Sequence, residues 1–258
     1  MNWRWAAGLA MTLSVLAACG SDNKRGRIAL VGATLINGTG EEPQPNSVIV
    51  VEGGRFRGVG GGSGTPIPFG SERVDLTGKY VMPELVNVMA GKSVEAHYTQ
   101  KEMENDLANG ATVLYGVPAE SAIVPLNLLE LIRSSNAAVA PMLAALSGGA
   151  RLKIGQANVK TLIESGVMVA VASTERTRAG MVREMELLAG GGADPKDILV
   201  AATRNGAKAL KAQDGSGTIQ AGAPADLLVL PGNPLTDVSV ISKVERVMRA
   251  GAWTDRSL

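Results

Sequence analysis

Apolar residues near both ends of the chain occur in short runs that are separated by turn-forming residues. Close to the N-terminus these runs are Ile28–Ile36 and Val48–Val51, each followed by an Asn-Gly or Gly-Gly turn sequence. Asp226–Leu230 and Val244–Met248 form similar runs close to the C-terminus. Short apolar runs bounded by such turns are typical of β-strands, so both ends of the chain are predicted to be β-structure.

The middle of the chain alternates between helix-like and strand-like segments. Helices are predicted over Met103–Asn109, Leu126–Ser134 and Val159–Ser165, and Asp194 has the position of an N-cap for a later helix. Five strands are predicted between them, at Val81–Val88, Val94–Tyr98, Thr112–Val117, Ala137–Leu143 and Val167–Ala172. This alternation indicates an α/β fold with a parallel sheet.

Composition agrees with a globular protein. Of 258 residues, 45% are hydrophobic, and the formal net charge is +1. This balance provides a core and leaves no strongly basic face, so nucleic acid is excluded as a partner.

The first 26 residues have a separate meaning. Arg4 precedes an apolar run that ends in Leu16-Ala-Ala-Cys19, and this pattern resembles a bacterial lipobox. We therefore interpret residues 1–18 as a lipoprotein signal peptide and residues 19–26 as a tether, with Cys19 as the lipidation site. The expected location is the bacterial cell envelope, with the lipid on Cys19 held in a membrane. Gly20 and Ser21 replace the Asp of an inner-membrane retention signal, which favours the outer membrane facing the periplasm.

Three further segments carry a resemblance to a known family. Residues 74–91 read VDLTGKYVMPELVNVMAG, residues 33–40 read ATLINGTG, and residues 217–230 read GTIQAGAPADLLVL. In their order along the chain these segments resemble the amidohydrolase superfamily, particularly its imidazolonepropionase-like and prolidase-like members. The first barrel strand of that family reads D-L-x-G-K-x-V-x-P-G-L-I-D-x-H-x-H, and its glycine and aspartate are replaced here by Glu84 and Asn87.

The resemblance implies a fold and a division of the chain. Residues 27–78 and 213–254 are expected to form a small composite β-sandwich in which Asp226 bonds backbone. Residues 79–212 then form a (β/α) TIM-like barrel, but a complete one takes roughly 250 residues. The barrel is therefore incomplete, and the best match places the deletion between Gly91 and Val94. An alternative register, in which residues 110–114 match the family's second strand, stays open.

The family binds zinc or another divalent metal, and most of its ligand positions are replaced. The two first-strand histidines match Met89 and Gly91, and the eighth-strand aspartate matches Thr174. The sixth-strand histidine falls at Tyr115 or Gly116. A thioether is a poor ligand for such ions, and glycine has no side chain to offer. His97, the only histidine, is the one possible survivor, so we assign no metal ligand, no catalytic residue and no cofactor.

The resemblance implies metal-dependent hydrolysis of non-peptide C–N or amide bonds, whereas the residues indicate a catalytically degenerate member. Whether the chain is an enzyme stays open at this point. The alternatives are a non-catalytic ligand- or partner-binding envelope lipoprotein, an active hydrolase with an altered site, and a decayed gene product. A homo-oligomer formed through exposed barrel edges is also expected, because unpaired strand edges favour pairing with another chain.

Overall fold

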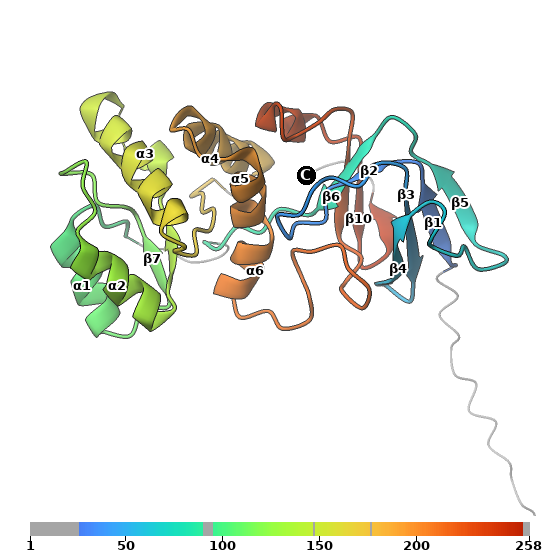
Figure 1. The fold of residues 1–258 in the computed structure, drawn as a ribbon, viewed down its shortest axis with the longest axis horizontal. Helices are drawn as coiled ribbons and strands as arrows, with labels where there is room; N and C mark the ends of the chain where they lie inside the picture. Colours follow the sequence, from blue (N-terminus) through green and yellow to red (C-terminus); the bar gives the residue numbers. More distant parts are fainter. Residues whose placement is uncertain (1–25, 90–94, 147, 176, 255–258) are drawn as a thin grey trace, which may run out of the picture.

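The computed structural model describes residues 26–254 except 90–94, 147 and 176. Figure 1 shows two parts, a β-rich part that contains both ends of the described chain and a helix-rich part formed by its middle. The β-rich part consists of two sheets. The first has the order β4 (Arg55–Gly61), β3 (Ser47–Glu52), β1 (Ile28–Val31), β5 (Glu72–Asp75). The second has the order β11 (Ala252–Thr254), β10 (Arg246–Arg249), β9 (Leu227–Leu230), β6 (Tyr80–Pro83), β2 (Thr34–Leu35).

The two sheets enclose one hydrophobic core. Leu30, Ile49 and Phe56 from the first sheet and Val81 and Leu227 from the second belong to the same buried cluster. Residues of one strand alternate between its two faces, so the period-two pattern selects which side chains enter this core. The N-terminal and C-terminal segments thus form one composite β-sandwich, as predicted.

The helix-rich part contains a short parallel ribbon covered by helices. The ribbon contains β7 (Val113–Tyr115) and β8 (Ala138–Ala140), paired in parallel. The helices are α1 (Gln100–Ala108), α2 (Leu126–Ser135), α3 (Gly149–Glu164), α4 (Arg178–Gly190), α5 (Pro195–Ala202) and α6 (Arg204–Ala209). Two 3₁₀ helices, η1 (Leu143–Ala145) and η2 (Val238–Lys243), complete the elements. None of the helices in the described part of the chain has the length and apolar character needed to span a membrane.

Three of the five predicted barrel strands differ in the structure. The segment predicted as Val81–Val88 contributes only β6, which pairs antiparallel with β9 and so belongs to the sandwich. Residues 95–98 form no strand, although the His97 N–H donates to the Tyr115 carbonyl at 2.7 Å. Residues 167–172 form a single bridge, between Val169 and Val139. The first segment thus pairs within the sandwich, and the other two make only a few backbone bonds in place of a ladder, so the barrel is incomplete, as expected. The predicted deletion between Gly91 and Val94 lies in a segment outside the described residues.

Small side chains line the inner face of this ribbon. Ala138, Ala140, Ala170 and Ala172 form a buried cluster with Met89 and other apolar residues. Because alanine occupies little volume, the few remaining strand segments curl together and still leave a close-packed interior. The Tyr115 hydroxyl donates to the Val88 carbonyl at 3.1 Å and so links the two sides of the curled ribbon.

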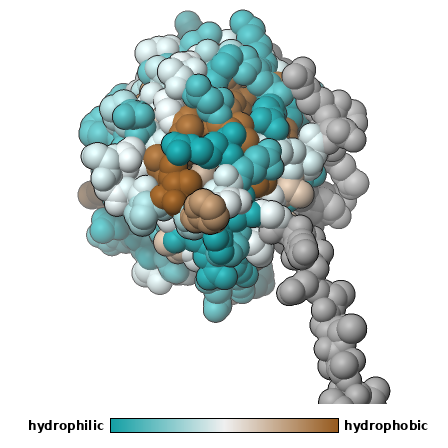
Figure 2. Space-filling view, turned by 90° about the vertical axis from the view of Figure 1, so that its right-hand side faces the viewer, coloured by the Kyte–Doolittle hydropathy of each residue, from teal (hydrophilic) through white to brown (hydrophobic). Residues whose placement is uncertain are grey.

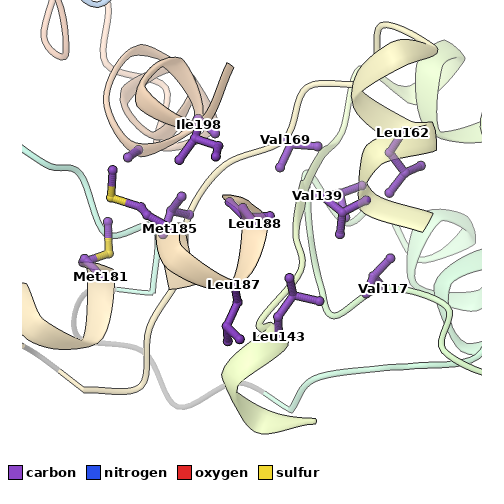
Figure 3. Close-up of a cluster of buried hydrophobic side chains, with 14 of the residues drawn as sticks. Val117, Val139, Leu143, Leu162, Val169, Met181, Met185, Leu187, Leu188 and Ile198 are labelled. Atoms are coloured by element: carbon purple, nitrogen blue, oxygen red, sulfur yellow. The ribbon is translucent and has the colours of Figure 1, made fainter. Parts of the chain in front are cut away.

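The outer face of the ribbon packs against helices. Figure 3 shows Val139 and Val169 in the same apolar cluster as Leu162 of α3, Leu188 of α4 and Ile198 of α5. Large aliphatic side chains outside and alanines inside follow the period of two along each strand segment. This packing fixes α4 beside the ends of the strand segments, where the candidate site lies.

Candidate functional site

A cavity of about 130 Å³ lies where the ribbon segments end and the following loops begin. In α/β barrels this carboxyl end of the strands carries the functional groups. Its lining comes from three elements: the η1 region after β8, the loop after residue 172, and α4. The lining residues are Met142, Ala144, Ala145, Ser173, Thr174, Glu175, Gly180, Arg183 and Glu184.

Glu184 is the buried charged group of this cavity, with only 4% of its surface exposed. Its two carboxylate oxygens accept hydrogen bonds from the backbone N–H groups of Leu143, at 2.9 Å, and Ala144, at 2.8 Å. Burial raises the pKa of Glu184 from 4.5 to about 7, although these two hydrogen bonds act in the opposite direction. Glu184 therefore changes charge near neutral pH while it faces a cavity.

The backbone around Glu184 is shaped to present these N–H groups. Met142 has φ 51°, in the left-handed region that side chains other than glycine seldom adopt. This turn starts η1, whose first N–H groups have no partner within the helix, and Glu184 accepts from two of them. The Tyr98 hydroxyl also donates to the Met142 carbonyl, at 3.1 Å. The strained residue is thus held from both sides.

Asn87 positions the second loop of the cavity. Its side-chain amide donates to the Ser173 carbonyl at 2.9 Å, and its side-chain oxygen accepts from the Ser173 N–H at 3.1 Å. The same oxygen accepts from the Met89 N–H at 3.0 Å. The residue that replaces the family's aspartate is therefore a structural clamp between the segment after β6 and the cavity loop. Glu84, which replaces the family's glycine, pairs with Arg249 of β10 at 2.9 and 3.0 Å.

The structure places the predicted metal positions in different surroundings. Met89 is 8% exposed and packs among the alanines of the ribbon interior. Thr174 is exposed and lines the cavity beside Glu184. Gly91 and Cys19, the predicted lipidation site, lie outside the described residues, as do residues 1–25 in general.

The single histidine pairs with an acidic side chain of α1. His97 Nδ1 lies 2.8 Å from Asp106 Oδ2 of α1, and this hydrogen bond raises the pKa of His97 above its ordinary 6.5. Gly116, one of the two candidate positions for the sixth-strand histidine, has φ +108°. A Cβ at Gly116 would lie 1.9 Å from the His97 carbonyl oxygen, so no side chain fits there. The other candidate, Tyr115, uses its hydroxyl to bond Val88.

The side chains present do not fit the metal that the family would hold. The positions offer a buried thioether, a threonine hydroxyl, a phenol that bonds backbone and an imidazole paired with a carboxylate. Within residues 26–89, 95–146, 148–175 and 177–254, no three His, Cys, Asp or Glu side chains come together in a way that could hold a metal ion.

Sequence reasoning missed Glu184, the most perturbed group of the site. The available signal was its position on the apolar face of α4, between Met181, Val182 and Met185, which are all buried. A charged residue on a buried helix face needs a polar partner. The sequence does not reveal that partner, because it lies about 40 residues earlier.

Comparison with known proteins fits this architecture. A family model described as "Amidohydrolase family" matches residues 69–254, well over half of the chain. The chain belongs to the amidohydrolase family. No curated protein matches its sequence.

Solved structures of amidohydrolases share the fold at low sequence identity. A phenylurea hydrolase B is 16% identical, with a TM-score of 0.70 over 90% of this chain and 97% of the other. A Xaa-Pro dipeptidase with bound methionine in the active site is 13% identical, with a TM-score of 0.70 over 90% of this chain and 100% of the other. A molinate hydrolase is 14% identical, with a TM-score of 0.69 over 89% of this chain and 95% of the other. At these identities the likeness shows the fold alone.

Proposed function

We propose that this chain is a non-hydrolytic, lipid-anchored amidohydrolase-family protein that binds a small amine-bearing ligand in the cavity beside Glu184. One observation carries the proposal. Met89, at the position of the family's first metal-binding histidine, is buried in an alanine-rich apolar core. At this position a packed hydrophobic side chain stands where the family has a polar metal ligand, while the family's fold is kept.

Hydrolysis in this family requires a metal that lowers the pKa of water and a base that takes its proton. The base position of the family is Thr174, whose hydroxyl does not titrate near neutral pH. His97 is paired with Asp106, at 2.8 Å. These assignments support loss of the hydrolytic reaction. The cavity beside Glu184 then remains as the place where a ligand would bind.

The chemistry of the cavity supports an amine-bearing ligand. Each Glu184 oxygen accepts one backbone N–H, and a carboxylate oxygen can accept a second hydrogen bond. A cation placed there offsets the cost of burying the carboxylate charge. The volume of about 130 Å³ has room for roughly four water molecules, which matches an ammonium group and its first carbons. One structural neighbour is described with methionine bound in its active site, so free amino acids are the first ligands to test.

Membrane attachment is the second part of the proposal. It rests on the Leu16-Ala-Ala-Cys19 sequence and on the apolar run before it. Replacing Cys19 with Ser should release the protein from the membrane fraction and remove the acyl mass from the mature chain. The anchor would be refuted if the variant fractionated like the wild type and the wild type carried no acyl mass.

Metal analysis and ligand titration test the binding function. Protein purified without chelator should contain far less than one equivalent of zinc, manganese or iron. Amino acids should raise the melting temperature of the wild type and of Glu186→Gln, a control at a half-buried position of α4 outside the cavity lining, but not that of Glu184→Gln. Stoichiometric metal that His97→Ala abolishes would refute the loss of metal binding and favour the alternative of an active hydrolase with an altered site.

Self-association through the sheet edges is the remaining part of the proposal. The edge of β7 is already partly paired, because the Tyr115 carbonyl accepts from the His97 N–H. The contact between two copies would therefore use the backbone N–H and C=O groups on either side of this hydrogen bond. Light scattering on purified protein should give the mass of a dimer or larger assembly, and a monodisperse monomer would refute it.

A further inference from the structure

We propose that the end of the β-sandwich that carries Phe69 lies against the lipid surface of the membrane. The inference rests on the anchor at Cys19, which is part of the proposed function, and it is independent of the cavity beside Glu184. It assigns a fixed orientation to the protein, with the sandwich at the lipid and the helix-rich part away from it.

Phe69 is fully exposed at the tip of a tight turn. Its relative exposure is 102%, the highest among the large hydrophobic residues of the described chain. The Ser71 N–H donates to the Pro68 carbonyl at 3.2 Å, and the Ser71 hydroxyl donates to the same oxygen at 2.7 Å. Gly70 has φ +79°, as a type II turn requires at its third residue. The aromatic ring is therefore held outward by an ordered backbone.

This turn lies beside the point where the chain joins the sandwich from its N-terminal side. The Glu72 N–H donates to the Arg27 carbonyl at 2.8 Å, and Ile28 pairs with Glu72 in the parallel β1–β5 ladder. In Figure 1 the loop that leads into β5 and the start of β1 lie at the same end of the molecule. Phe69 is thus three residues from a direct contact with the first strand.

The length of the tether restricts how far this end moves from the membrane. Seven residues lie between Cys19 and Arg27, and the eight residue-to-residue steps of a fully extended chain span at most about 29 Å. Lys24 and Arg25 lie in this tether, where basic side chains attract anionic lipid headgroups, whereas Arg27 pairs with Glu52 at 2.6 Å. Lipidation therefore brings the Phe69 turn to the membrane, and the charges favour its contact.

The character of the surface fits a lipid interface. Figure 2 faces this end of the molecule and shows hydrophobic side chains gathered in the middle of it. Ile67 and Pro68 next to the turn are partly exposed, and Arg73 of β5 is exposed. The acidic Glu72 is also exposed, so the basic charge of this end comes from Arg73 and the tether. An exposed aromatic residue with basic side chains nearby is a combination found where proteins meet lipid headgroups.

A fluorescent label can report this contact on the full-length lipoprotein. The thiol of Cys19 is consumed by the lipid, so a cysteine introduced at Phe69 is the only free thiol. The matched control is Leu126→Cys, because Leu126 is 75% exposed and begins α2 in the other part of the molecule. Each variant is labelled with an environment-sensitive fluorophore and placed in vesicles of phosphatidylethanolamine and phosphatidylglycerol that contain a headgroup quencher.

The expected result is a blue shift and strong quenching at position 69, with neither at position 126. A label at Glu72→Cys should also be quenched, and adding Phe69→Ser should reduce that quenching. Equal solvent exposure of both labels in a membrane-bound protein would overturn the docking while the anchor stands. If the protein did not bind the vesicles and the fluorophore reacted with Cys19, the thiol would carry no lipid. That result would refute the anchor and the docking together. If the label at position 69 were shielded from solvent in the absence of lipid, and light scattering gave the mass of a dimer, this face would contact a second copy. That result would overturn the proposal.

Discussion

The raised pKa of Glu184 predicts that the protein becomes less stable as the pH rises from about 4.5 to about 8. An unfolded glutamate releases its proton near 4.5, whereas folded Glu184 keeps it until about 7. Protons therefore favour the folded state within this window. The resulting stability is fully present below the unfolded pKa and is lost as the pH rises through the folded one.

The magnitude follows from the two values. The gap between 4.5 and about 7 corresponds to about 3 kcal/mol of unfolding free energy. Glu184 is only 4% exposed, so solvent screening does not reduce this figure much. His97 contributes with the same sign, because its raised pKa also stabilises the fold at lower pH. Since the lowered pKa values of Glu52 and Asp75 affect stability below about 4.5, they lie outside the window.

Urea unfolding at a series of pH values measures this effect, and Glu184→Gln isolates it. The amide does not titrate, so its stability should change with pH only through His97 and the minor groups. The difference between wild type and Glu184→Gln should therefore vary by about 3 kcal/mol across the window. Glu186→Gln, on the same helix but half-buried, should keep the slope of the wild type. Parallel curves for wild type and Glu184→Gln would refute the reasoning, because they would show that Glu184 titrates normally.

Three further predictions concern the surroundings of the site. Asp106→Asn should return the pKa of His97 toward its ordinary value, and NMR titration of the single imidazole would measure it; an unchanged titration would contradict the hydrogen bond. Asn87→Ala should lower the unfolding free energy by about 1–3 kcal/mol, because the Ser173 backbone loses both partners; a neutral result in urea unfolding would contradict the clamp. Gly116→Ala should prevent stable folding, since its Cβ meets a backbone oxygen at 1.9 Å, and a cooperative melt near the wild-type temperature would show that the backbone there moves freely.

Several local features could be read directly from the sequence. Helix α2 begins at Leu126, where the apolar pattern predicted it, and the Asp194 side chain caps α5 by accepting the Lys196 N–H at 2.8 Å. Asp226 bonds backbone, as expected, through its contact with the Ala250 N–H at 2.6 Å. Caps, turns and helix starts depend on residues within a few positions of one another, so a single sequence contains what they need.

Other features depend on residues that are distant in the chain. The segment Tyr80–Pro83 has an apolar pattern that suits either a barrel or a sandwich, and its pairing with β9, almost 150 residues later, decides for the sandwich. The alignment with the family located Met89 and Thr174, but only the packing shows that one is buried among alanines and the other lines a cavity.

By itself, the sequence determined the family, the α/β class and the composite β-sandwich, because these follow from motifs and from the order of short elements. The tertiary structure alone decided that Glu184 is the titrating group of the site. Its pKa depends on burial by α4 and on two N–H groups about 40 residues earlier, and such a combination arises only when the chain is folded. The same holds for Phe69, whose exposure and closeness to Arg27 come from the pairing of β1 with β5.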